Sequence, residues 1–182
     1  MSRRADKSSL ARAFGLRGAF WVVSGVLLAA LGCFAADSPP QVTLDATKAA
    51  PRTVEALTER SIVRDYRFAW ANLSQALASN SAEPLNGLFQ GTANSRLHDE
   101  VSSQLRNGLT SRYLNQTHKL EAVFYAPEGD VMELHDTAEY DLEVLDGNKT
   151  IQSAHAVVHY IVLMTPGADR WVVRQLQSVP HF

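Results

Sequence analysis

The feature that most constrains this chain is an apolar segment near its start. Five basic residues precede the run from Gly18 to Ala36, and that run contains no charged residue. A helix of this length spans roughly 28 Å, close to the hydrocarbon thickness of a bilayer. Cations before the segment and none within it follow the positive-inside rule. The segment therefore predicts delivery of the remaining chain to or across a membrane, which leaves that part extracytoplasmic.

Three fates of this segment each leave a different mature protein. An uncleaved single-span anchor is favoured, because the apolar run is longer than the core of a usual signal peptide. Cleavage after Ala36 gives a periplasmic or secreted protein. Lipidation of Cys33, which follows the small residue Gly32, gives a lipoprotein. We expect a single-pass cell-membrane protein with residues 1–36 as anchor or signal, 37–52 as a linker and 53–182 as one domain.

Charge and cysteine content narrow what the extracytoplasmic part does. Residues 37–182 hold 12 Lys/Arg and 18 Asp/Glu, a formal charge of −6, and an acidic surface does not favour nucleic acid. Cys33 is the chain's only cysteine, so disulfides and cysteine-based metal sites are excluded from the domain. The sequence has no phosphate-binding glycine loop, no serine elbow and no His-Glu-x-x-His motif. It therefore predicts no cofactor.

Periodicity divides the domain into helices followed by strands. Prolines at both ends of 37–52 indicate an extended linker. Helical spacing of apolar residues then predicts helices from Thr53 to about 77, from 83 to 91 and from 93 to 113. After Asn115 the period becomes two, with strands at 118–125, 131–145, 151–164 and 171–179 separated by turns. This order predicts an α+β domain in which three helices pack on a four-stranded antiparallel sheet.

Three features of the sequence resemble the NTF2-like, or cystatin-like roll, superfamily. They are the aromatic pair Tyr66 and Trp70, the helical 85–91 segment and the ending Asp169-Arg170-Trp171-Val172-Val173. The resemblance covers residues 53–180 and implies a strongly curved sheet around three helices and a conical cavity. Residues 88–105 with the Trp171 strand also resemble the membrane-anchored inner-space domain of chloroplast and cyanobacterial division proteins. The superfamily includes enzymes and structural modules, so it leaves function open.

The resemblance implies where an active site would lie. Enzymes of this superfamily place an acid or base on an inward sheet position that faces a helix tyrosine. Asp136 shares a strand face with Ala138 and Tyr140, so Asp136 with Tyr66 is the candidate catalytic pair. The alternative is that Asp136 lies near a strand bend and is solvated or bonds to a neighbouring backbone amide. Whether the chain is an enzyme stays open at this stage, with no catalysis favoured.

Two histidines on the third strand suggest a metal site that strand geometry excludes. His155 and His159 point the same way, yet positions i and i+4 of a strand lie roughly 13 Å apart. One metal ion with bonds near 2 Å does not bridge that distance. No metal is predicted.

The outward face of this third strand is more apolar than a solvated sheet face usually is. It presents Val157, Ile161 and Leu163 beside His155 and His159. We expect a homodimer or another protein partner to cover it, or else the C-terminal residues 180–182.

The sequence thus predicts a membrane-tethered extracytoplasmic binding or assembly module without catalysis. The alternative is a small-molecule-binding or isomerase/dehydratase-type cavity protein. The many aromatic residues, which include Trp70 and Trp171 and which we expect to be buried, favour a filled cavity and hence the first interpretation.

Overall fold

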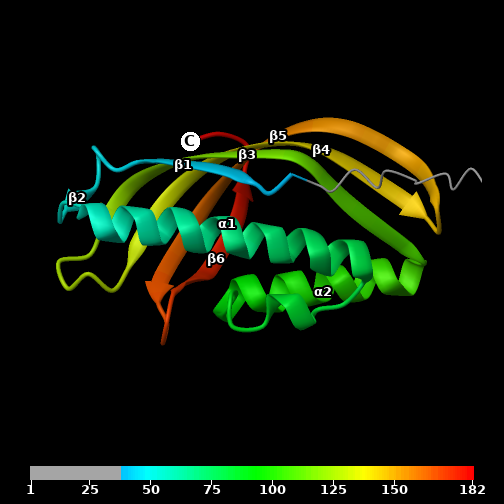
Figure 1. The fold of residues 1–182 in the computed structure, drawn as a ribbon, viewed down its shortest axis with the longest axis horizontal. Coiled ribbons are helices and arrows are strands. Elements are labelled where there is room, and N and C mark those ends of the chain that lie inside the picture. The colour runs from blue at the N-terminus through cyan, green and yellow to red at the C-terminus, as the bar shows by residue number, and fades with distance from the viewer. Residues whose placement is uncertain (1–37) are drawn as a thin grey trace, which may run out of the picture. The chain divides into compact units, whose positions relative to one another are not determined.

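A long curved sheet lies over two helices in residues 38–182, the part of the chain that this computed structural model describes (Figure 1). The predicted anchor or signal segment and Cys33 lie outside the described residues. Within 38–182, no helix is long and apolar enough to cross a membrane.

The sheet has six strands in the order β1-β3-β4-β5-β6, with β2 also paired to β3. From β3 to β6 each strand pairs antiparallel with the next, as consecutive hairpins require. β1 and β2 pair parallel with β3. The strands are β1 Gln41–Asp45, β2 Ala50–Pro51, β3 Leu109–Tyr125, β4 Met132–Asp146, β5 Lys149–Pro166 and β6 Trp171–Val179.

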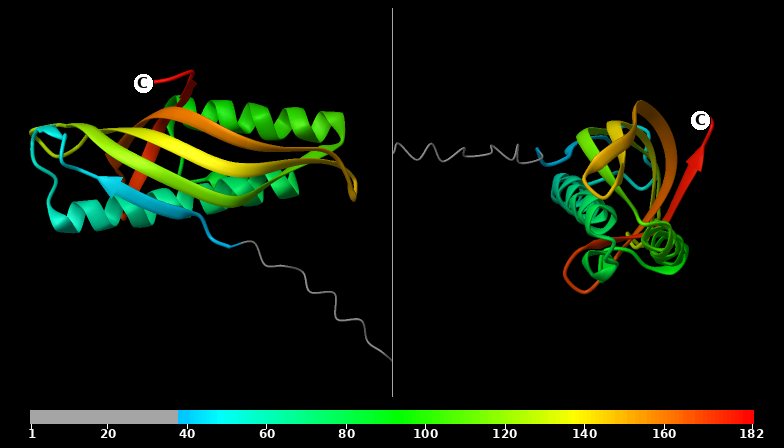
Figure 2. Two further views of the ribbon diagram at one scale, coloured as in Figure 1. Left: turned by 90° about the horizontal axis from the view of Figure 1, so that it is seen from above. Right: turned by 90° about the vertical axis from the view of Figure 1, so that its right-hand side faces the viewer.

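Both α-helices lie on the same side of the sheet (Figures 1 and 2). They are α1, Ala56–Ser79, and α2, Gly91–Asn107, with a short 3₁₀ helix η1, Glu83–Leu85, between them. α1 ends at Asn80 and α2 at Gly108, which both adopt left-handed backbone conformations. Their N–H groups bond to carbonyls of the last helical turn and so close each helix.

The predicted α+β class is confirmed, but the predicted counts of helices and strands are wrong. The middle helix shrinks to η1 because the backbone is already extended at Asn86 and Gly87 then adopts a φ of 75°. Gly91 begins α2 rather than ending a helix, and the positive φ of Gly108 stops α2 before the predicted end at 113.

Residues expected to form only a linker contribute the first two strands. Gln41-Val42-Thr43-Leu44-Asp45 alternates polar and apolar side chains, and Val42 is buried. This alternation suits a half-buried strand that adds to the edge of β3. Pro39 and Pro40 precede β1 and Pro51 ends β2, so no proline interrupts either strand.

The core fills the space between the helices and the sheet. Every third or fourth residue of α1 is buried, as its apolar stripe predicts. Alternate residues of β4 from Met132 to Tyr140 are also buried, which confirms the predicted inward face. Trp70 is buried as expected, whereas Trp171 is only partly buried and packs against the core's edge.

Candidate functional site

Three polar side chains meet inside this core. Tyr66 comes from α1, His118 from β3 and Asp136 from β4, and none is more than 1 % exposed. The Tyr66 hydroxyl donates a hydrogen bond to Asp136 Oδ2 over 2.7 Å. His118 Nδ1 lies 2.8 Å from the same oxygen, where a carboxylate accepts from the ring N–H. We call these residues the buried triad.

The surroundings of the triad determine which group donates in the Tyr66–Asp136 hydrogen bond. Two other polar atoms of the triad have no hydrogen-bond partner in the described part of the chain. Burial and then the nearby Asp136 carboxylate raise the pKa of the Tyr66 phenol well above its usual value. The phenol therefore stays protonated and donates. His118 Nε2 and Asp136 Oδ1 have no hydrogen-bond partner among residues 38–182. A carboxylate, an imidazole and a phenol in contact are groups that acid–base catalysis uses.

The triad, however, is closed to substrates in this conformation. Tyr66 and Asp136 are 0 % exposed and His118 is 1 % exposed. The Trp70 ring lies against the His118 ring, with centroids 4.3 Å apart, and is itself 2 % exposed. The interpretation of Asp136 as a solvated residue at a bend is therefore wrong.

The sequence placed two of the three triad members and missed the third. Strand alternation put Asp136 on the inward face, and the helical stripe put Tyr66 opposite it. His118 alternates with the buried residues Leu120 and Ala122, which is the signal that places it inward. Its contact with Asp136 depends on the register of β3 against β4, in which Leu120 pairs with Asp136.

A small cavity remains on the far side of Trp70. It measures about 230 Å³, and Trp70, Tyr113 and Tyr160 line it together with Glu100 at α2. The hydroxyls of Tyr140 and Tyr160 lie 3.2 Å apart beside it. Desolvation raises the pKa of Glu100. Trp70 lines this cavity and also packs against His118 of the buried triad.

The outer face of β5 carries the five residues predicted to bind a partner. Val157 is 56 % exposed and His155 is also exposed, whereas Ile161, Leu163 and His159 are half-buried. The C-terminal Phe182 covers part of this face. Its ring stacks on His135 at 4.3 Å and meets the edge of His159 at 4.9 Å.

The histidines of this face do not converge on a metal site. His155 Nδ1 bonds Asp141 at 2.9 Å, while His159 Nδ1 lies 3.3 Å from Thr137 Oγ1 on the neighbouring strand position. No group of three potential metal ligands occurs among residues 38–182. A hydrogen bond from His155 to Asp141, reinforced by the charges of Asp141 and Glu139, raises the pKa of His155.

The pair of His155 and Asp141 makes the stability of the fold depend on pH. Because the folded pKa of His155 exceeds the unfolded value near 6.5, the pair stabilises the fold fully below that value and loses its effect as pH rises through the folded pKa. In an NMR titration, Asp141→Asn should lower the pKa of His155, whereas Glu143→Gln on the same strand should leave it unchanged. An unchanged His155 pKa in Asp141→Asn would contradict the assignment.

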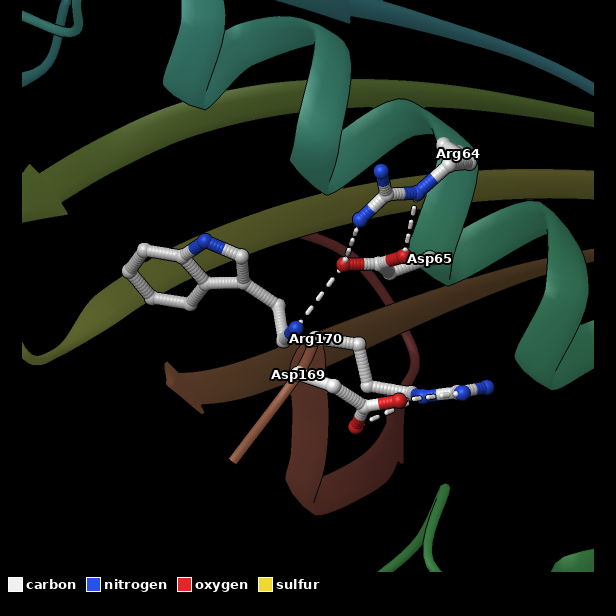
Figure 3. Close-up of polar contacts among 5 residues, drawn as sticks. Arg64, Asp65, Asp169 and Arg170 are labelled. Carbon is white, nitrogen blue, oxygen red and sulfur yellow. Dashed lines mark hydrogen bonds and ion pairs between the residues drawn. The ribbon is translucent and has the colours of Figure 1, made fainter. Parts of the chain in front are cut away.

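A groove of about 580 Å³ lies between α1 and the turn before β6, and ion pairs line it. Figure 3 shows these ion pairs. Asp65 accepts hydrogen bonds from the Arg64 guanidinium at 2.7 and 3.1 Å and from the Trp171 backbone N–H at 2.8 Å. Arg170 pairs with Asp169 and lies over the Phe68 ring. Asp65 thus ties α1 to the start of β6, which explains an aspartate within the apolar stripe.

Comparisons with known proteins concern the fold alone. No protein-family model matches the chain, and no curated protein matches it in sequence. Among solved structures, the intermembrane-space region of the chloroplast protein ARC6 superposes with a TM-score of 0.54 at 15% identity, covering 71% of this chain and 98% of that one. At this identity the match shows a shared fold.

Two further structures are more distant. A protein of unknown function from Mycobacterium tuberculosis matches at a TM-score of 0.43 and 15% identity, covering 69% of this chain and 76% of its own. A cystatin-like protein of unknown function from Nostoc punctiforme matches at 0.37 and 15% identity, covering 70% and 95%. Both resemblances predicted from the sequence, to a cystatin-like fold and to a chloroplast inner-space domain, occur among these structures. The ARC6 region confirms the second at the level of the fold.

Proposed function

We propose that this chain is a membrane-tethered, extracytoplasmic binding module that acts without catalysis. The observation that carries the proposal is the closure of the buried triad. Catalysis by Asp136 and Tyr66 requires a substrate within hydrogen-bond reach of them. Their side chains instead bond to each other and to His118 beneath the Trp70 ring.

The hydrogen bonds of the triad have a structural reason. A buried polar group costs free energy unless it is hydrogen-bonded. Asp136 Oδ2 gives both Tyr66 and His118 an acceptor and so joins α1, β3 and β4 at one point. The same residues that suggest chemistry in the sequence therefore hold the helix against the sheet.

Tethering to a membrane rests on the charge-free segment from Gly18 to Ala36 and the five basic residues before it. The fold shared with the intermembrane-space region of ARC6 supports the proposal that the domain lies on the far side of that membrane. The segment brings the domain close to the bilayer and to other proteins held there.

The binding surface in this proposal is the outer face of β5, and Val157 is its most exposed apolar residue. The ring contacts of Phe182 are with His135 and His159 and not with Val157, so Phe182 leaves the surface around Val157 exposed. Apolar surface next to a polar rim of His155, Glu139 and Asp141 is typical of a protein contact.

Replacing Val157 with glutamate tests this surface. A charge on a solvated face costs little, whereas a charge in a dry interface costs several kcal/mol. Val157→Glu in the full-length protein should therefore weaken self-association or partner binding about tenfold or more, measured by analytical ultracentrifugation and pull-down, with an unchanged circular dichroism spectrum. Leu57→Glu, which alters a still more exposed apolar residue on α1, is the control. Equal binding by both variants would count against the surface.

A second candidate function has one observation in its favour. The cavity beside Trp70 is lined by aromatic rings and has Glu100 at its edge, a combination suited to a small ligand with an apolar body and a polar end. Such a ligand would contact Tyr113 and Tyr160 without reaching Asp136. The cavity would then serve binding and not isomerisation or dehydration.

A further inference from the structure

β5 has one edge that is paired only along part of its length. β4 pairs with β5 from Lys149 to Met164, whereas β6 on the other edge pairs only from His159 onward. In Figure 1 the β4–β5 hairpin extends well past the end of β6. Among residues 38–182 no strand pairs with the outer edge between 150 and 158. We call this stretch the free edge.

The free edge lacks the features that usually prevent strands from pairing between molecules. Exposed edges are commonly protected by lysine, proline or inward-pointing charges. The free edge reads Thr-Ile-Gln-Ser-Ala-His-Ala-Val-Val, with no lysine, arginine, carboxylate or proline. Its regular pairing with β4 from Gln152 onward already holds the backbone extended. A partner strand therefore meets a preformed row of N–H and C=O groups.

The length and sequence of the free edge select one register for a second copy of itself. In an antiparallel pair, two residues that lie directly opposite each other point to the same face of the sheet. When the two strands are copies related by a two-fold axis, one residue therefore lies opposite its own copy at that axis. An axis at Ala154 pairs Gln152 to Ala156 regularly and extends to 150 and 158 across the bulge at Ile151, where β4 has no opposite residue. It places Ile151 of one copy opposite Val157 of the other, and these are the exposed large apolar residues of β5.

Neighbouring registers are worse for identifiable reasons. An axis at His155 sets one imidazole directly opposite another and drives Ile151 against the position where β6 begins to pair. An axis at Ser153 pairs only residues 150–156 before it sets Val157 opposite Lys149, the first residue of β5. At Ala154, His155 faces Ser153 and no like charges are opposed.

We propose that two copies of this chain pair through the free edge of β5, antiparallel and centred on Ala154, so that their sheets become continuous. This inference rests on the proposed binding function and specifies its partner as a second copy. It also brings the two Val157 side chains and the outer faces around them into one surface.

Cysteine cross-linking of the full-length, membrane-embedded protein tests the register, with Cys33→Ser as the parent. Directly opposite residues have Cβ atoms about 4.5–5.5 Å apart, close to disulfide reach. Ala154→Cys should form a disulfide dimer under mild oxidation. Ser153→Cys and His155→Cys should each cross-link poorly when expressed alone. They should cross-link well when co-expressed, because Ser153 of one copy lies opposite His155 of the other. Ala78→Cys, an exposed alanine on α1, measures random collision.

A second variant measures the same contact without oxidation. Ala154→Lys opposes two like charges at the axis and should raise the dimer dissociation constant about fivefold or more. The inference would be overturned if Ala154→Cys gave no more dimer than Ala78→Cys. It would also be overturned if the single cysteine variants at 153 and 155 gave as much dimer as their mixture. If Val157→Glu still weakens binding to a different protein in that case, the proposed function survives and only the second copy is excluded.

Discussion

Replacing Trp70 with alanine should lower the free energy of unfolding by about 3 to 5 kcal/mol. The ring is 2 % exposed and lies within 6.3 Å, between centroids, of the rings of Tyr66, Tyr113, Tyr140 and Tyr160 and closer still to His118. Removing it leaves a void among these rings, next to the 230 Å³ cavity that Trp70 lines. Since a domain of this size has about 5–15 kcal/mol in total, the variant should approach unfolding.

Urea denaturation followed by circular dichroism measures this loss. Leu57→Ala removes a large apolar side chain from the same helix at a position that is 73 % exposed, and should change stability by less than about 0.5 kcal/mol. If Trp70→Ala costs no more than Leu57→Ala, the packing described for α1 is wrong.

Removing the Asp136 carboxylate should destabilise the fold almost as much. Asp136→Ala leaves the Tyr66 hydroxyl and the His118 Nδ1–H without an acceptor in a dry interior. At about 1–3 kcal/mol for each unsatisfied group, the expected loss is about 2–6 kcal/mol. Tyr66→Phe removes only one donor and should cost less. Asp136→Asn keeps an acceptor oxygen and should cost least of the three.

Chemical denaturation of the three variants orders them. A native-like stability for Asp136→Ala would show that the triad does not hold α1 to the sheet, and would remove the structural explanation for its burial.

Local patterns predicted the faces of the long elements but not the contacts between distant ones. The apolar stripe of α1 and the alternation in β4 each place one side chain inward, so Tyr66 and Asp136 were expected to face each other. His118 joins them only through the pairing of β3 with β4, and register is set by packing across the whole sheet.

Short elements were the least predictable. β1 and β2 are five and two residues long, and both need the edge of β3 to pair with. The alternation in β1 is too short to distinguish a strand from an extended linker. Likewise, Asp65 looks misplaced on an apolar stripe until the Trp171 N–H is seen to bond to it. These contacts join residues that are far apart in the sequence, and the local spacing of apolar residues does not predict such contacts.

The central claim is that the buried triad is structural and that the chain acts by binding through β5. Complementation of cells that lack the protein by full-length Asp136→Asn and Val157→Glu, both first shown to be folded by circular dichroism, tests it most directly. The account predicts that Asp136→Asn restores function and Val157→Glu does not. A catalytic aspartate would lose about a hundredfold or more of its rate on conversion to asparagine. Loss of function in Asp136→Asn with full function in Val157→Glu would contradict the account.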